Sequence, residues 1–160
     1  MEARKMKVTF TKYIDNDSIV MLKGKTKLEV LNEIISKAAQ RSQLDRDLIF
    51  RLTWKREQMM TTGVGNGLGL PHIRVNNIPD PIIIVGVCAE PITDYQSQDD
   101  QPVRVIVYIM AADERPEEYL QLLGSVSRKL RNPEVINEII ANIGNPGQIL
   151  KVIKSQQDGE

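Results

Sequence analysis

The sequence predicts an α/β (α+β) sandwich, in which a mixed central β-sheet is flanked by helices. Two apolar runs, residues 82–88 and 103–110, have the length and composition of buried strands. Amphipathic stretches with helix-capping residues lie before and after them. Between the first helices and these strands, residues 61–75 contain too many glycines for a regular helix.

The first elements are a strand and a helix. Residues 18–22 (SIVML) predict a short strand. Thr26 and Glu29 then have the spacing of a capping box, with a hydroxyl at the N-cap and a carboxylate three residues on. A helix to about Gln40 follows, because five apolar residues recur at helical spacing: Leu28, Leu31, Ile34, Ile35 and Ala38.

A second helix is predicted from Asp45, as its cap, to residues 58–60. The glycine-rich segment comes next and ends in LGLPH, which can form a short strand. Pro71 donates no hydrogen bond to a neighbouring strand, so we expect this strand to be an edge or an irregular one.

The second half of the chain holds two long strands and three helices. Residues 82–88 are almost continuously apolar, which is typical of a strand buried on both faces. Pro116 opens a helix with acidic residues in its first turn and basic residues at its end, an order that suits the helix dipole. Two shorter helices, residues 133–142 and 146–153, are set off by Asn-Pro pairs.

Length and composition indicate one domain, residues 1–160, with a core at about 14–153 and loose ends. Of the 160 residues, 41% are hydrophobic and 26% charged, a balance typical of globular proteins. The longest apolar run, residues 81–89, is far below the roughly 20 residues of a membrane span, and the N-terminus has no apolar signal core. We therefore expect a cytoplasmic protein without direct membrane insertion.

Charge and residue counts exclude several kinds of site. Lys plus Arg and Asp plus Glu both number 21, and no basic run appears, which argues against nucleic-acid binding. The single Cys88 excludes a disulfide framework and is expected to be a buried, inert thiol. Asp94, Asp99 and Asp100 could approach His72, but they lack a metal-ligand spacing, and we predict no metal.

The glycine-rich segment matches no nucleotide-binding loop. Counting from Gly63 or Gly65, the sixth position of the dinucleotide fingerprint is Leu68 or Leu70 instead of glycine. No lysine follows the glycines, so the segment is not a Walker loop either.

The segment could still serve phosphoryl transfer. Neutral His72 is a possible nucleophile, and successive glycine N–H groups can hold an anion. Arg56 and Arg74 could supply positive charge, and the hydroxyls of Thr61 and Thr62 could donate hydrogen bonds. A histidine beside a turn can equally be a surface or capping residue, and the residues alone leave both interpretations open.

Residues 55–75, KREQMMTTGVGNGLGLPHIRV, resemble enzyme IIA components of the bacterial phosphoenolpyruvate-dependent phosphotransferase system (PTS). The resemblance is to the fructose/mannitol type, and most closely to its nitrogen-regulatory branch. It rests on Arg-Glu at 56–57, TTGVGNG at 61–67 and Pro-His at 71–72, and it extends over about residues 14–153.

The resemblance implies a function and its site. His72 would be phosphorylated by a phosphohistidine carrier protein of the HPr type and would pass the group to a IIB domain or use it as a signal to a regulatory target. Arg56 matches the active-site arginine, and backbone N–H groups of Gly65, Asn66 and Gly67 would cradle the phosphoryl oxygens. No cofactor is implied, because the donor's phosphohistidine supplies the energy.

The chain departs from the family pattern at three places. Relatives usually carry a second histidine where this chain has Tyr119, which can donate one hydrogen bond but carries no positive charge. Ile73 replaces the small residue after Pro-His, and its β-branch disfavours a positive φ. Ala111 or Ala112 replaces a proline expected in the loop before the next helix.

These departures keep an alternative open, a degenerate IIA-fold module that binds a regulatory partner and is rarely or never phosphorylated. A small-molecule hydrolase is a third possibility, but the only histidine would have to serve as both base and nucleophile.

Overall fold

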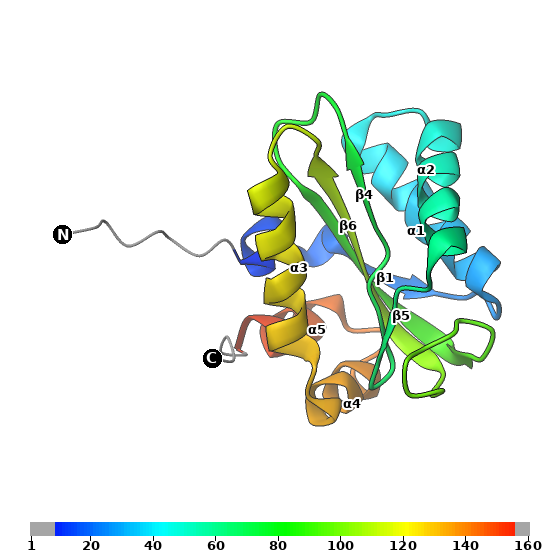
Figure 1. Cartoon of the computed structure of the whole chain (residues 1–160). Coiled ribbons are helices and arrows are strands. Elements are labelled where there is room, and N and C mark those ends of the chain that lie inside the picture. The colour runs from blue at the N-terminus through cyan, green and yellow to red at the C-terminus, as the bar shows by residue number, and fades with distance from the viewer. Residues whose placement is uncertain (1–8, 156–160) are drawn as a thin grey trace.

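The computed structural model describes residues 9–155 as a six-stranded mixed sheet with helices on both faces (Figure 1). It confirms the predicted fold class. The strands are β1 (Ile19–Leu22), β2 (Gly63–Gly65), β3 (Leu68–Gly69), β4 (His72–Val75), β5 (Ile82–Ile92) and β6 (Val103–Ala112). The α-helices are α1 (Lys27–Ser42), α2 (Arg46–Met59), α3 (Pro116–Leu130), α4 (Pro133–Ala141) and α5 (Pro146–Ser155). Two short 3₁₀ helices, Phe10–Tyr13 and Asn16–Ser18, precede β1.

Strand β6 is the centre of the sheet. The strand order is β1-β5-β6-β3-β2, and β4 also pairs with β6. β5 and β6 are antiparallel, whereas β3 and β4 run parallel to β6, one after the other along the same edge. In this register Leu68 lies opposite Val105 and His72 lies opposite Ile109.

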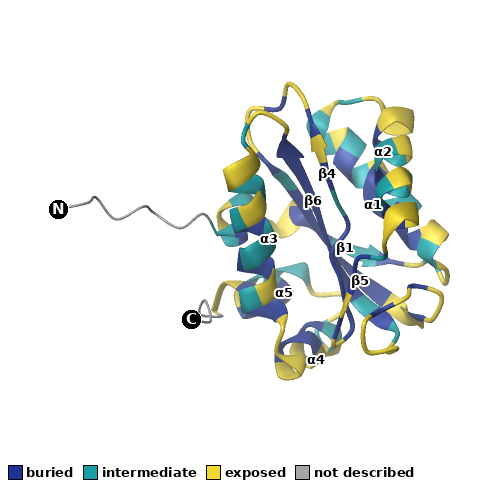
Figure 2. Ribbon diagram, viewed as in Figure 1, coloured by how far each residue is buried: buried dark blue, intermediate teal, exposed yellow. Residues whose placement is uncertain are grey.

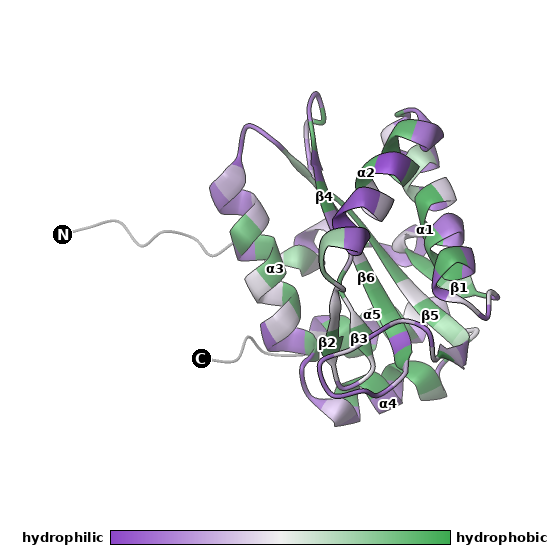
Figure 3. Cartoon of the chain, turned by 45° about the vertical axis from the view of Figure 1, so that its right-hand side comes forward, coloured by the Kyte–Doolittle hydropathy of each residue, from purple (hydrophilic) through white to green (hydrophobic). Residues whose placement is uncertain are grey.

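Two helical layers bury the two faces of this sheet. Helices α1 and α2 cover one face, and α3, α4 and α5 cover the other (Figures 1 and 2). Strands β5 and β6 are hydrophobic along most of their length, and the helices carry their hydrophilic residues on the outside (Figure 3). Side chains of β6 alternate between the layers, so this strand belongs to both cores.

The observed boundaries differ from the predicted ones mainly at strand ends. β5 continues to Ile92 and β6 to Ala112, beyond the predicted ends at residues 88 and 110. Ala111 and Ala112, expected near a loop, are buried and pair with β4. A proline there would lack the N–H that a central strand donates, so alanine suits the longer strand.

Helix α1 begins where the capping signal predicted. The Thr26 side-chain oxygen accepts a hydrogen bond from the Glu29 N–H at 3.2 Å. Among residues 9–155, none of the helices combines the length and apolar character that crossing a membrane requires.

Candidate active site

His72 is the first residue of β4, and a main-chain contact fixes its ring. Its Nδ1 lies 2.7 Å from the carbonyl oxygen of Leu70. A carbonyl oxygen can only accept a hydrogen bond, so Nδ1 carries the proton and donates it. The lone pair of this neutral imidazole is therefore on Nε2, which makes Nε2 the nucleophilic nitrogen.

The surroundings of His72 favour the neutral ring. Burial lowers the pKa of His72 below its usual 6.5, and the positive charge of Arg56 lowers it further. The Leu70 carbonyl and the Glu57 carboxylate act in the opposite direction but with less total effect. Most of the protein thus has an unprotonated Nε2 at neutral pH.

A cleft of about 310 Å³ opens at His72. Helix α2 contributes Arg56, the end of β6 is followed by Asp113, and α3 contributes Tyr119. The full lining is Leu52, Arg56, His72, Ile73, Arg74, Asp113 and Tyr119. The structure therefore brings four predicted site residues, from three separate elements, into one cleft.

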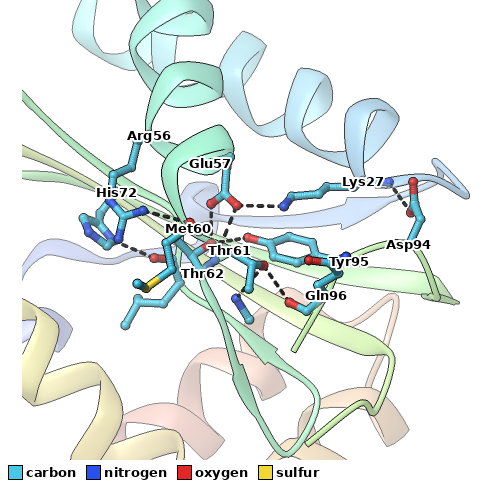
Figure 4. Close-up of polar contacts among 12 residues, drawn as sticks. Lys27, Arg56, Glu57, Met60, Thr61, Thr62, His72, Asp94, Tyr95 and Gln96 are labelled. Atoms are coloured by element: carbon cyan, nitrogen blue, oxygen red, sulfur yellow. Dashed lines mark hydrogen bonds and ion pairs between the residues drawn. The ribbon is translucent and has the colours of Figure 1, made fainter. Parts of the chain in front are cut away.

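Arg56 lies in the last turn of α2, beside the His72 ring (Figure 4). Its Nη1 donates a hydrogen bond to the carbonyl of Met60, 2.8 Å away. Carbonyl groups at a helix C-terminus lack partners within the helix, so a basic side chain there satisfies one of them. This contact holds the guanidinium at the mouth of the cleft.

Tyr119 and Arg74 also line the cleft and contact each other. The Tyr119 ring centroid lies 5.5 Å from that of His72, with the planes tilted by 55°. The Arg74 guanidinium carbon lies 5.4 Å from the Tyr119 ring centroid, and its Nε is 3.6 Å from Asp113 Oδ1. Burial raises the pKa of Tyr119, although Arg56 and Arg74 oppose this, so its hydroxyl stays protonated and can donate.

Ile73 fits its position without backbone strain. It lies in the extended backbone of β4 and is not among the described residues with positive φ. Its side chain is buried in the core beneath α2. The β-branched residue after the histidine is therefore compatible with this strand.

Thr61 and Thr62 lie outside the cleft lining, and both hydroxyls have other partners. Thr61 donates to the Gln96 carbonyl at 2.6 Å. The buried Thr62 hydroxyl donates to Glu57 and accepts from the Tyr95 hydroxyl at 2.5 Å (Figure 4). The structure thus gives these hydroxyls a role in tying segments together instead of facing the imidazole.

The glycine turn also lies away from His72. Gly65, Asn66 and Gly67 have φ values of 104°, 56° and 81° and connect β2 to β3. Four residues of β6, about 13 Å of strand, separate the positions opposite Leu68 and His72.

This turn holds an anion of its own chain. The Asn66 N–H donates to the Asp99 carboxylate at 2.8 Å. Backbone N–H groups of Asn66 and Gln101 hold the pKa of Asp99 below its usual value. The Asn66 N–H is therefore occupied by a carboxylate of the same chain, and the turn lies far along the sheet from the imidazole whose phosphoryl group it was expected to hold.

The acidic loop and the cysteine have structural surroundings. Within residues 9–155, no group of three or more His, Cys, Asp or Glu side chains could hold a metal ion. Asp94 accepts a hydrogen bond from the Lys27 N–H at 2.8 Å, at the start of α1. Cys88 is fully buried, and burial raises its thiol pKa to about 12, which makes it a poor nucleophile.

The sequence did not identify Leu70 or Asp113 as parts of the site. Leu70 acts through its carbonyl group, which carries no sequence signal. Asp113 directly follows the last residue of β6, and an acidic residue just after a buried strand was the only available clue.

Comparisons with known proteins agree with these observations. Residues 12–156 match the protein family described as "Phosphoenolpyruvate-dependent sugar phosphotransferase system, EIIA 2". The chain is 32% identical over 96 residues to a PTS system fructose-specific EIIA component of Haloferax volcanii. That alignment covers 60% of this chain and 62% of the relative.

Two solved structures show the same fold. The nitrogen regulatory protein IIA-Ntr from Neisseria meningitidis superposes with a TM-score of 0.81 at 18% identity, covering 90% of this chain and 98% of that one. Enzyme IIA mannitol from Escherichia coli, solved in complex with phosphorylated enzyme IIB mannitol, gives a TM-score of 0.72 at 16% identity, covering 89% and 98%.

Proposed function

This chain belongs to the EIIA 2 family of the phosphoenolpyruvate-dependent sugar phosphotransferase system, and from that premise we propose that it carries a phosphoryl group on Nε2 of His72. The observation that carries the proposal is the hydrogen bond from Nδ1 to the Leu70 carbonyl. It leaves the lone pair on Nε2, in a cleft that two arginines line.

The transfer step is a displacement at phosphorus. The Nε2 lone pair of His72 forms a bond to the phosphorus of a donor phosphohistidine, and the donor's P–N bond breaks with its electrons returning to the donor nitrogen. No proton has to leave His72, because Nδ1 keeps its proton and its hydrogen bond to the Leu70 carbonyl. The ring gains positive charge, which the Leu70 carbonyl stabilises.

The cleft supplies positive charge and a donor for the transferred oxygens. Arg56 and Arg74 neutralise charge on the phosphoryl group, and the Tyr119 hydroxyl donates one hydrogen bond. Relatives usually carry a second histidine where this chain has Tyr119. Arg74 supplies part of the positive charge that such a histidine would provide. The Thr61, Thr62 and glycine-turn groups are not needed, since they lie outside this lining.

The donor is a phosphohistidine carrier protein, and the acceptor is a IIB domain or a regulatory target that responds to the phosphorylation state. Two observations support this: the fold is shared with a IIA protein that was solved with a phosphorylated IIB partner and with a nitrogen regulatory protein. The cleft is open to solvent, as docking of a partner's histidine requires.

The test is phosphorylation in a reconstituted relay. The protein is incubated with phosphoenolpyruvate, enzyme I and an HPr-type carrier, and intact mass is measured at neutral and acidic pH. We expect a gain of one phosphoryl group that is lost in acid and absent from His72→Gln. A chain that stays unmodified, while a fructose-type IIA protein is labelled in the same mixture, rejects the carrier function.

The degenerate binding module is not favoured: the hydrogen bond between His72 Nδ1 and the Leu70 carbonyl and the two arginines in the cleft support a phosphocarrier. The same experiment separates the two functions, since a module of that kind gains no phosphoryl group.

A further inference from the structure

A buried polar cluster lies behind the His72 cleft and is connected to it by main-chain hydrogen bonds. The cluster consists of Lys27, Glu57, Thr62 and Tyr95, referred to below as the Glu57 cluster (Figure 4). It joins the start of α1, the end of α2, the entry to β2 and the segment after β5.

Glu57 is the centre of this cluster. Its side chain is 2% exposed, and its Oε2 lies 2.8 Å from Lys27 Nζ. Its carboxylate also accepts hydrogen bonds from the hydroxyl and the N–H of Thr62. The Lys27 ammonium group lies 4.4 Å from the centroid of the Tyr95 ring. A buried carboxylate with this many donors is held in one geometry.

A chain of hydrogen bonds leads from Thr62 to the imidazole. The Thr62 carbonyl accepts from the Leu70 N–H at 2.9 Å, and the Leu70 carbonyl accepts from His72 Nδ1 at 2.7 Å. The main chain of Leu70 is thus held by Thr62 through its N–H group, and it holds the His72 ring through its carbonyl group.

Glu57 also anchors the helix end that carries Arg56. Adjacent residues on a helix point about 100° apart, so Arg56 faces the cleft while Glu57 faces the interior. The buried Glu57 carboxylate therefore holds the last turn of α2, which carries Arg56, against Thr62 just before the start of β2. Thr62 in turn bonds the main chain of Leu70, which orients His72.

We infer that Glu57 and Thr62 are positioning residues for phosphoryl transfer, which hold the Leu70 carbonyl so that His72 keeps its proton on Nδ1 and presents Nε2. The inference rests on the proposed phosphocarrier function. Neither residue lines the cleft, so both act through the main chain of Leu70 and not through contact with the phosphoryl group.

The central test replaces Thr62 by valine, which keeps the shape and removes the hydroxyl. We expect the maximal rate of His72 phosphorylation to fall about tenfold, as for loss of groups that orient a metal-ligating histidine. The KM for the carrier protein should stay unchanged, because the cluster is buried. Thr62→Ser restores the hydroxyl and should recover most of the rate.

A matched control is available in the same helical layer. Thr53 is buried on α2, and its hydroxyl pairs with that of Tyr108 at 2.7 Å, outside the chain of hydrogen bonds that leads from Thr62 to His72. Thr53→Val removes a buried threonine–tyrosine hydrogen bond of the same kind. It should lower stability to a similar degree and leave the phosphorylation rate unchanged.

Nitrogen NMR of the His72 ring tests the inference without any transfer reaction. In the unmodified protein Nδ1 should be protonated and Nε2 unprotonated above the ring's pKa. Thr62→Val should shift both nitrogen signals toward the average of two exchanging tautomers, whereas Thr53→Val should not. This reading holds even if the protein is never phosphorylated, so failure of the carrier function and failure of the positioning role are distinguishable.

Equal rates and identical ring spectra for Thr62→Val and Thr53→Val would overturn the inference. If Thr62→Val does not fold, Tyr95→Phe removes a single hydroxyl from the cluster and takes its place. The expected result for Tyr95→Phe is the same shift in ring signals, and an unchanged ring would again reject the role.

Discussion

His72 combines two demands, a nucleophilic nitrogen and a fixed orientation, and a single main-chain contact meets both. The Leu70 carbonyl selects the tautomer, and burial together with Arg56 favours the neutral form. The hydrogen-bond acceptor is a main-chain carbonyl oxygen, so the selection does not depend on a second histidine.

The lowered pKa of His72 gives a first prediction. The ring should titrate with a midpoint below 6.5 when followed by proton NMR, and phosphorylation should be pH-independent above that midpoint. Because the unfolded chain binds the proton more tightly, the free energy of unfolding should fall as pH drops below 6.5 toward the folded midpoint. A midpoint above 6.5 contradicts this account of the site.

A second prediction concerns the two arginines. Arg56→Gln should slow phosphorylation by about 100-fold, because it removes a charge held at the cleft mouth. It should also raise the pKa of His72, since that charge lowers it. Arg74→Gln should cost less, because Arg74 is half-exposed and shares its charge with Asp113. Rates with the carrier protein and NMR titration measure both effects, and a larger loss from Arg74→Gln would reverse this ranking.

At the scale of elements, the site depends on how short strands are packed. The β2–β3 hairpin lies between β6 and the segment after β5, and Gly63 forms an isolated parallel bridge with Ser97. The Gln98 N–H donates to the Gly63 carbonyl at 3.3 Å. A Cβ at Gly63 would overlap the Gln96 carbonyl, so only glycine fits.

Gly63→Ala is therefore the third prediction. It should lower the free energy of unfolding by about 2 kcal/mol, because the two main chains must move apart. Gly147→Ala is the control, since it lies in the first turn of α5 with no heavy atom closer than 3.8 Å to the added Cβ. That change should be neutral or stabilising by roughly 0.5 kcal/mol. Urea unfolding measures both, and equal effects would argue against the close approach at Gly63.

Helix ends show where sequence signals were sufficient and where they were not. Thr26 and Glu29 predicted the start of α1, because capping depends on residues close in sequence. Asp45 is the N-cap of α2 as predicted, but its side chain makes no capping hydrogen bond. The extra length of β5 and β6 came from pairing with partner strands, which local composition does not specify.

For the whole molecule, β6 couples the two helical layers. Its residues pack into both cores, and it pairs with β3, β4 and β5. A molecule built this way should unfold in one transition, since neither layer can lose its contacts without disturbing the shared strand.

The fourth prediction tests that coupling. Leu122 is fully buried on α3, and Trp54, the only tryptophan, packs against the opposite core from α2. Leu122→Ala should destabilise by about 3 kcal/mol and shift the urea midpoint equally by far-ultraviolet circular dichroism and by Trp54 fluorescence. An unshifted fluorescence transition would mean that the layers unfold independently.

The sequence by itself determined the fold class, the order of the main helices and strands, and the pairing of His72 with Arg56. Those features follow from periodicity, capping residues and a local motif, all of which act over short stretches of chain. Tyr119 and Arg74 were also named from the sequence, but only the tertiary structure decided that they share the cleft at His72, that Asp99 fills the glycine turn, and that Thr62 belongs to the Glu57 cluster. These contacts join residues that are distant in sequence, and their geometry depends on strand register and helix packing, which no local pattern encodes.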